Sequence, residues 1–170
     1  MELSSIAFPR QLEAEGSVKK IRSVLSVRKT RLWTEGKLEV PVLNISESMI
    51  SAMKKARMQR RVRFGLDDIF ERLTAEKKGI DHLHQETQSK QGERISRLLL
   101  FSNDGAERFY RCIEQILTEH RQRILGCRLD VDGRTLGQLI TGRSAGIKVI
   151  LVEHKDAVSD VLRSLADSEK

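Results

Sequence analysis

Four carboxylates in the second half of the sequence could hold a metal ion. Asp104, Asp130 and Glu153 each lie at or just beyond the carboxyl end of an expected β-strand, and Asp132 follows Asp130 closely. In open α/β sheets, ligands bind at the carboxyl ends of the strands. Magnesium is typically held there by a few carboxylates together with phosphate oxygens. These acids could therefore serve a metal-dependent enzyme that transfers phosphoryl groups of nucleic acid.

Turn and capping chemistry explains the same acids without a metal. The segments LDVD and VILVEHKDAVSDVL are similar to two motifs of the toprim fold, but toprim proteins carry the glutamate motif first, and here the order is reversed. Short acidic side chains are also typical of turns and of the residues that begin helices. We favour this second interpretation and expect no catalytic residue, no bound metal and no cofactor.

Basic residues form a stronger pattern than the acids. One group of six positive charges contains no acid, and a second acid-free group runs from Lys19 to Arg31. The formal net charge is +7 and the isoelectric point is about 9.7. Such clusters favour a polyanionic partner, because lysine and arginine release the counterions of a phosphate backbone. The residues of the first group are Lys54, Lys55, Arg57, Arg60, Arg61 and Arg63.

Aromatic side chains are too few to form a stacking platform for single-stranded nucleic acid. They make up 4% of the residues, and Trp33, Phe64 and Tyr110 are the main candidates for an exposed ring. Because single strands are commonly bound by stacking their bases on aromatic rings, we expect structured RNA or a duplex shape as the ligand.

Length and composition predict a cytoplasmic protein with one core. A chain of 170 residues is long enough for one domain with an appended arm. Cys112 and Cys127 lack the spacing of metal ligands and fit buried thiols in a reducing compartment. The segment MELSSIAFPRQLEAEG does not have the pattern of a signal peptide. No apolar run approaches the length of a membrane span, so we expect no membrane partner.

The sequence divides into a basic N-terminal arm, residues 1–45, and a domain formed by residues 46–170. Within the arm we expect a loose tail, a short basic helix and a possible hairpin that turns at TEGK, and the arm is a candidate surface for a protein partner. Pro41 predicts that the second hairpin strand lies at the edge of a sheet, since proline cannot donate a ladder hydrogen bond.

Residues 46–170 are expected to form a three-layer α/β/α sandwich around a small mixed sheet. Helix-spaced apolar residues alternate with strand-length runs such as LLLF and VILV. These runs show no polar alternation, which is typical of strands covered on both faces. The polar stretch 80–94 has no clear period and is expected to be a linker or an insertion.

The order of segments in this domain resembles the kink-turn-binding ribosomal-protein superfamily, the L-seven-Ae and L-thirty-e fold. The similarity covers roughly residues 48–166, about two thirds of the chain. It rests on a basic helix with a glycine turn, a strand with an acidic turn, a Leu-Gly turn, and a closing strand and helix. The matching segments are ISAMKKARMQRRVRFGLDDIFERL, RLLLFSNDGAERFYRCIEQIL, GRTLGQLITGR and IKVILVEHKDAVSDVLRSL.

The resemblance implies two contact regions for RNA. In the family, a G-x-N-E-x-x-K motif begins the second helix. Gly65 matches its glycine, Asp67 and Asp68 stand at the Asn and Glu positions, and Glu71 replaces the lysine. The second region is a loop whose glycines let backbone N–H groups approach phosphate. Its residues here are Leu136, Gly137, Gly142 and Arg143.

These features together predict a non-enzymatic RNA-binding protein of the ribosome or translation class. It would bind structured RNA through the basic helix and the glycine loops. The alternatives are the metal-dependent enzyme and a module whose basic face binds an acidic protein. If the Leu-Gly turn approaches phosphate, Gly137→Val should reduce RNA affinity more than stability; if Gly137 only packs closely, stability should fall instead.

Overall fold

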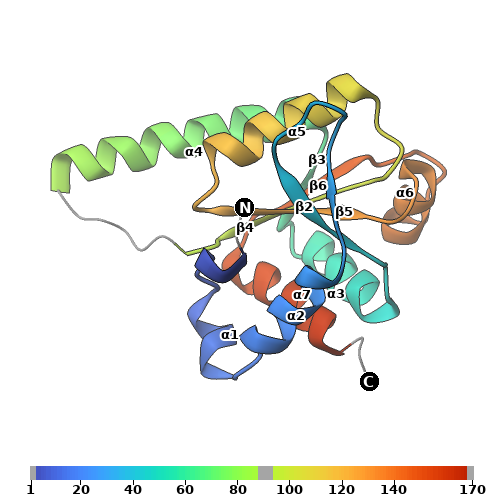
Figure 1. Cartoon of the computed structure of the whole chain (residues 1–170), viewed down its shortest axis with the longest axis horizontal. Coiled ribbons are helices and arrows are strands. Elements are labelled where there is room, and N and C mark those ends of the chain that lie inside the picture. Colours follow the sequence, from blue (N-terminus) through green and yellow to red (C-terminus); the bar gives the residue numbers. More distant parts are fainter. Residues whose placement is uncertain (1–2, 88–93, 168–170) are drawn as a thin grey trace.

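A computed structural model describes residues 3–87 and 94–167 as an α/β sandwich with one six-stranded mixed sheet (Figure 1). The strand order across the sheet is β1-β2-β5-β4-β6-β3. The strands are β1 (Lys29–Arg31), β2 (Glu39–Leu43), β3 (Val62–Phe64), β4 (Arg97–Phe101), β5 (Ile124–Leu129) and β6 (Val149–Val152).

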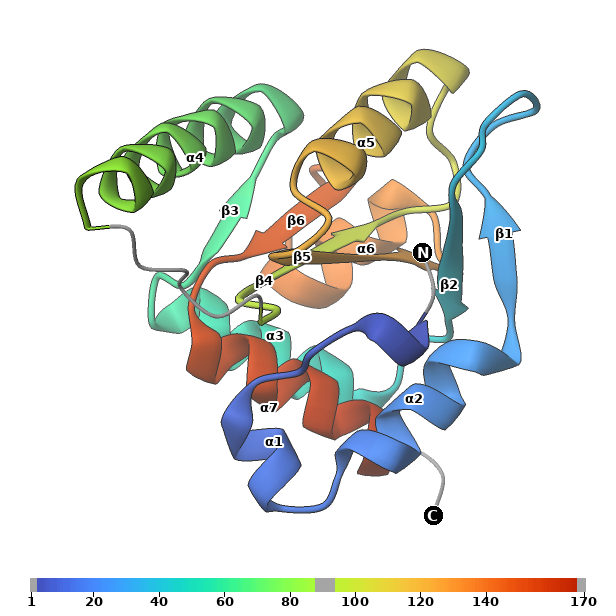
Figure 2. The same ribbon diagram turned by 60° about the vertical axis from the view of Figure 1, so that its left-hand side comes forward.

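Seven α-helices in the described residues cover the two faces of this sheet (Figure 2). On one face α4 and α5 pack over the strands, and on the other lie α1, α2, α3, α6 and α7. The helices are α1 (Arg10–Ala14), α2 (Val18–Val27), α3 (Glu47–Met58), α4 (Leu66–Thr87), α5 (Glu107–Glu119), α6 (Gly133–Thr141) and α7 (Lys155–Asp167), preceded by the 3-10 turn η1 (Leu3–Ser5). The expected α/β/α sandwich is confirmed.

The directions of the strands determine which residues lie at each of the two ends of the sheet. β2, β5 and β4 run parallel, whereas β6 runs antiparallel to β4, and β3 antiparallel to β6. We call the end where β4 and β5 finish the glycine end, because Gly65 and the loop after α6 lie there. The opposite end, where β4 and β5 begin and β6 finishes, carries Arg61, Arg97 and Arg123, and we call it the basic end.

The central strands are buried on both faces, as their sequence predicts. All four residues of β6 are buried, and successive residues join different clusters: Ile150 and Val152 pack with α3 and α7, and Val149 and Leu151 pack with α4 and α5. Each Å² of apolar surface that is buried stabilises the folded state by about 25 cal/mol. These apolar runs therefore contribute strongly to stability.

The first 45 residues belong to this core and do not form a separate arm. Phe8, Leu12, Ile21 and Leu25 are fully buried in the same cluster as α3 and α7. The expected basic helix and hairpin are present as α2 and β1–β2, but β2 also pairs with β5 and so extends the main sheet. The described residues before and after the expected boundary at residue 45 therefore share one core and one sheet.

Pro41 does not place β2 at the edge of the sheet, which is a correction to the sequence expectation. β1 is the edge strand, and β2 lies between β1 and β5. The pairing of β2 with β5 involves Val42 and Leu43, so it begins only after the proline. The missing N–H of Pro41 therefore removes no ladder hydrogen bond on that side.

A carboxylate on α5 fixes the hairpin to the domain. The backbone N–H groups of Lys37 and Leu38 donate to Glu114 Oε1 at 2.9 and 2.7 Å, and the Trp33 indole donates to Oε2 at 2.5 Å. Burial alone would raise the pKa of Glu114, but these hydrogen bonds outweigh it and lower the pKa. The Arg111 guanidinium lies over the Trp33 ring, 4.6 Å from its centroid.

α4 continues well beyond the sheet. It includes residues 80–87, so the first part of the expected linker 80–94 is helical, and residues 88–93 lie outside the described residues. Figure 1 shows this helix projecting past the basic end. Among the helices of the described residues, none is long and apolar enough to cross a membrane.

Candidate nucleic-acid interface

The structure places the expected RNA contacts at opposite ends of the sheet. The end of α3 and the following Arg60 and Arg61 lie at the basic end, whereas Gly65 follows β3 at the glycine end. Arg61 and Gly65 are four Cα–Cα steps apart along the extended β3 segment, which corresponds to about 13 Å. The basic helix and the glycine loops are therefore two surfaces, not one.

The end of α3 is shaped by a left-handed residue that is not glycine. Ser46 begins the helix, and its hydroxyl accepts a hydrogen bond from the Met49 N–H. At the other end Arg60 has φ +57°, and the Arg61 N–H donates to the Ala56 carbonyl at 2.8 Å. This is the backbone pattern that usually has glycine at the left-handed position. An arginine in this conformation costs about 1 kcal/mol of stability.

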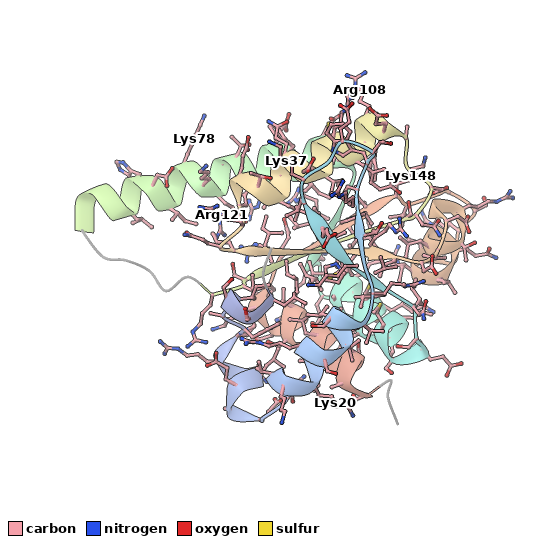
Figure 3. All side chains as sticks on the ribbon, viewed as in Figure 1. Lys20, Lys37, Lys78, Arg108, Arg121 and Lys148 are labelled. Carbon is pink, nitrogen blue, oxygen red and sulfur yellow. The ribbon has the colours of Figure 1, made fainter. Side chains whose placement is uncertain are left out.

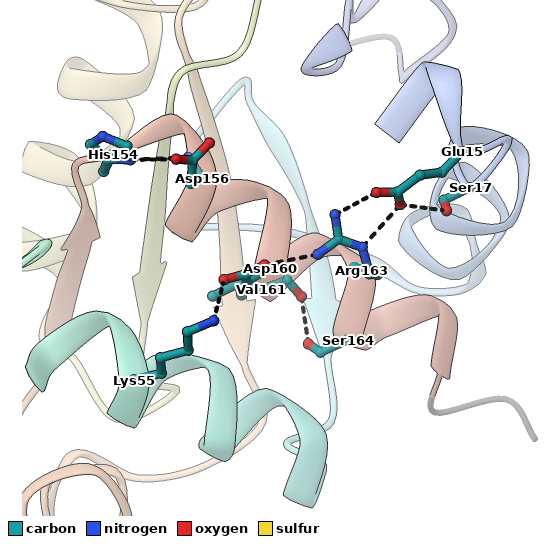
Figure 4. Close-up of polar contacts among 9 residues, drawn as sticks. All are labelled: Glu15, Ser17, Lys55, His154, Asp156, Asp160, Val161, Arg163 and Ser164. Atoms are coloured by element: carbon teal, nitrogen blue, oxygen red, sulfur yellow. Dashed lines mark hydrogen bonds and ion pairs between the residues drawn. The ribbon is translucent and has the colours of Figure 1, made fainter. Parts of the chain in front are cut away.

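Two of the six basic residues between Lys54 and Arg63 are paired within the protein. Lys55 Nζ lies 3.5 Å from Asp160 of α7, and Arg63 Nε lies 2.8 Å from Glu153. Figure 4 shows the contact between Lys55 and Asp160. Arg72 Nε also reaches Glu153, at 3.6 Å. The other four residues form no ion pair with the described part of the chain. We call them the α3 cluster: Lys54, Arg57, Arg60 and Arg61.

The glycine end carries mixed charges. Gly65 has φ +88° and directly precedes α4, and the exposed Asp67 and Asp68 occupy the first turn of that helix. Acids at a helix N-terminus are stabilising, because they complement the helix dipole. They also repel phosphate. Gly142 ends α6 with φ +72°, next to the exposed Arg143.

Leu136 and Gly137 support this end from inside the protein. The Leu136 side chain is fully buried in the core. Gly137 is also buried, and a Cβ atom there would lie 2.2 Å from the Ala145 carbonyl oxygen. These two residues hold α6 against the loop that leads into β6, so neither offers a side chain or an open backbone to a ligand.

Asp130 and Asp132, two of the acids considered as metal ligands, are engaged in protein contacts. Asp130 accepts hydrogen bonds from Asn103 and Arg28, each at 3.2 Å, and both interactions lower its pKa. Asp132 directly precedes α6 and caps it by accepting a hydrogen bond from the Thr135 N–H at 3.1 Å.

Asp104 and Glu153 are the other two acids, and they do not form a common metal-binding group with Asp130 and Asp132. Asp104 Oδ1 accepts from the Gly133 N–H at 2.9 Å and the Ser102 hydroxyl at 2.8 Å. Glu153 lies at the basic end, because β6 runs antiparallel to β4 and β5. Within residues 3–87 and 94–167, no group of acidic, histidine or cysteine side chains could hold a metal ion.

A groove at the basic end was not anticipated from the sequence. It has a volume of about 1240 Å³ and lies between the underside of α4, the start of β4 and β5, and the beginnings of α1 and α7. Its described cationic residues come from five separate segments, so no single stretch of sequence indicates it. They are Arg10, Lys77, Arg94, Arg97, Arg121, Arg123 and Lys155.

One carboxylate, that of Glu76, binds the two arginines Arg97 and Arg123 that line the inner side of this groove. Glu76 of α4 accepts from Arg97 at 3.1 Å and from Arg123 at 3.2 Å, and Arg72 lies 3.3 Å away. Its side chain is only 14% exposed. Burial would raise the pKa of Glu76, but Arg97 and Arg123 outweigh it and lower the pKa.

Comparison with known proteins gives distant structural similarity only. No protein-family model matches the sequence, and no curated protein sequence matches it significantly. One solved structure, a protein with unknown function from Bacillus halodurans, aligns with a TM-score of 0.49 and 15% identity, covering 72% of this chain and 99% of that chain. Another, the Giardia lamblia 15.5kD RNA binding protein, aligns with a TM-score of 0.46 and 9% identity, covering 73% and 89%.

Proposed function

We propose that this protein binds structured RNA without catalysing a reaction, as a divergent relative of the kink-turn-binding ribosomal proteins. The α3 cluster carries the proposal. Its four cations lie in the C-terminal half of α3 and in the residues that follow it, and they form no ion pair within the described residues. Unpaired clustered cations attract phosphate strongly, because each one releases a condensed counterion on binding.

The order of elements from α3 to α7 supports the family relationship. It runs helix, strand, glycine turn, helix, then strand and helix in alternation, which is the order expected from the resemblance. The family's contact at the glycine turn is weakened here, since Asp67, Asp68 and Glu71 replace its amide and lysine pattern with acids. We therefore assign the main phosphate contact to the α3 cluster instead of the glycine turn.

A non-catalytic role is favoured over phosphoryl transfer by the positions of the acids. Asp104, Asp130 and Asp132 are used in turns and a helix start, and Glu153 pairs with Arg63 at the other end of the sheet. A magnesium site needs several oxygen ligands around one point, and these four acids do not converge.

Neutralising the α3 cluster tests the proposal. A variant with Lys54, Arg57, Arg60 and Arg61 changed to alanine should lose most of its affinity for a fluorescein-labelled RNA hairpin. The slope of log affinity against log salt should become shallower by about three units, because each phosphate contact contributes slightly under one. Fluorescence anisotropy over a range of salt concentrations measures both quantities.

Single substitutions provide the matched control. Lys54→Ala should weaken binding more than Lys55→Ala, because Lys55 already pairs with Asp160. An unchanged slope in the four-fold variant would exclude the α3 cluster as the contact. Binding of the parent to an acidic polypeptide but not to RNA would favour the protein-interaction alternative.

Arg60→Gly is expected to stabilise the protein and weaken RNA binding. Glycine adopts positive φ without a Cβ clash, so the free energy of unfolding should rise by about 1 kcal/mol. RNA affinity should fall several-fold, because one cation of the α3 cluster is lost. Thermal unfolding and anisotropy measure the two effects. A fall in stability would instead show that the Arg60 side chain has a structural role.

A further inference from the structure

We propose that the groove at the basic end binds the phosphate backbone of an RNA strand, extending the contact made by the α3 cluster across the end of the sheet. This inference rests on the RNA-binding function proposed above, and it assigns a second contact that the resemblance to ribosomal proteins does not supply. The glycine end, which the family resemblance implies as the RNA contact, is at the opposite end of the sheet.

The charge and size of the groove fit a strand of RNA. Its described lining contains seven lysines and arginines against three acids, Asp81, Glu119 and Asp156. At about 1240 Å³ it exceeds the 300–1000 Å³ that is typical of small-molecule pockets. No Phe, Tyr or Trp is among the described lining residues. The groove therefore suits phosphates and sugars, and it offers no aromatic platform for bases.

The inner arginines are held in place but are not fully paired. Glu76 fixes one nitrogen of Arg97 and one of Arg123. Arg97 Nε and Arg123 Nη1 are buried and have no hydrogen-bond partner in the described part of the chain. Arg72, Arg97 and Arg123 thus share one carboxylate, which leaves this wall with excess positive charge.

Three exposed cations of the groove, Lys77, Arg121 and Lys155, form no ion pair within the described residues. Lys155 is the first residue of α7, where the helix dipole disfavours a positive charge. The buried His120 lies among these cations; burial and then the charge of Lys77 lower its pKa, so its ring is neutral at pH 7.

The groove and the end of α3 lie at the same end of the sheet. The Glu153 N–H donates to the Arg61 carbonyl at 2.8 Å, which joins the residues after α3 to the segment that leads into Lys155. From there the basic end continues through the first residues of β4 and β5. Adjacent strands are about 4.8 Å apart, so β3, β6, β4 and β5 span about 15 Å. One RNA strand could contact both surfaces.

A triple variant tests the groove separately from the α3 cluster. Lys77→Ala, Arg121→Ala and Lys155→Ala should together lower the salt slope by about two units and weaken binding at least tenfold for a fluorescein-labelled RNA hairpin with a single-stranded tail. The matched control removes the same charge outside the groove: Lys37→Ala, Lys78→Ala and Arg108→Ala. Figure 3 shows Lys78 pointing away from the molecule and Arg108 at the far end of α5 from Arg121. The control should change the slope by less than about half a unit.

The outcomes separate this inference from the proposed function. If the groove variant binds like the control while the α3 variant loses binding, the groove proposal is wrong and the RNA-binding proposal stands. If the parent protein binds no RNA at low salt, both are wrong. Circular dichroism confirms that each variant is folded.

His120 provides a second readout inside the groove. In the parent protein, RNA should shift the NMR signals of the His120 ring and raise its pKa, because phosphate offsets the charge of Lys77. His154, which lies outside the groove lining, should respond less. A His120 ring that is unaffected by saturating RNA would overturn the groove proposal.

Discussion

A Gly137→Val protein is expected to lose about 3 kcal/mol of unfolding free energy, with a fall of roughly 10 °C in melting temperature. The Cβ atom alone would lie 2.2 Å from the Ala145 carbonyl oxygen and 3.1 Å from the Ile147 nitrogen. Both are backbone atoms, so α6 must move away from the loop. Because α6 packs on the core through Leu136 and Ile140, that movement also costs apolar burial.

Gly146→Ala is the matched control in the same loop. A Cβ atom at Gly146 would meet its nearest neighbours at 3.6 Å, an ordinary contact, and Gly146 does not have positive φ. Its melting temperature should change little. The Gly137 variant that remains folded should bind RNA like the parent. A variant that melts normally but has lost RNA affinity would contradict the packing role and restore a direct contact at the Leu-Gly turn.

The second half of the fold could be predicted because its information is local. Runs such as LLLF and VILV are long enough and apolar enough to indicate strands buried on both faces, and they became β4 and β6. The basic helix and the hairpin of the first 45 residues were also visible in the local pattern.

What could not be predicted depends on contacts between distant segments. Residues such as Phe8 and Leu12 become core only because α1 packs beside α7, where Arg163 binds Glu15 at 2.7 Å. Strand periodicity does not encode direction, so the sequence predicts Glu153 at the same sheet edge as Asp130, whereas it lies at the other end of the sheet. The groove is formed by five distant segments, so the sequence does not predict it for the same reason.

The candidate site illustrates this limit on a smaller scale. In the sequence, the six basic residues from Lys54 to Arg63 are equivalent. In the structure, Lys55 and Arg63 are paired with acids 90 residues or more away, and the other four are not. Charge patterning therefore predicts that a basic surface exists, but only the fold decides which cations remain available to a ligand.

Glu76→Ala is expected to destabilise the protein by about 3 kcal/mol. Arg97 and Arg123 are 19% and 23% exposed and would each lose their acidic partner. Removing one member of a largely buried ion pair leaves an uncompensated charge, which costs more than the pair itself contributes. Glu107→Ala is the control, since it breaks the exposed pair with Arg111 and should cost only a few tenths of a kcal/mol. Urea unfolding of both variants measures the difference.

The pH dependence of stability gives an independent test of Glu76. The folded protein holds the pKa of Glu76 below its ordinary value of 4.5. Its stabilising contribution is therefore complete above that value and is lost as the pH falls through the lower folded pKa. In Glu76→Gln the decline of stability below about pH 4.5 should be shallower than in the parent. If stability declines equally in both proteins, protonation of Glu76 does not cause the loss of stability at low pH.

Glu76→Gln is expected to change stability and RNA affinity in opposite directions. The substitution removes the only carboxylate that pairs with the two inner arginines of the groove among the described residues, so Arg97 and Arg123 become available to phosphate. Stability should fall, whereas RNA affinity should rise several-fold and the salt slope should steepen by up to about one unit. A purely structural role for this cluster would lower stability and leave the slope unchanged. The sign of the change in RNA affinity therefore distinguishes a wall that binds phosphate from one that only holds α4 on the sheet.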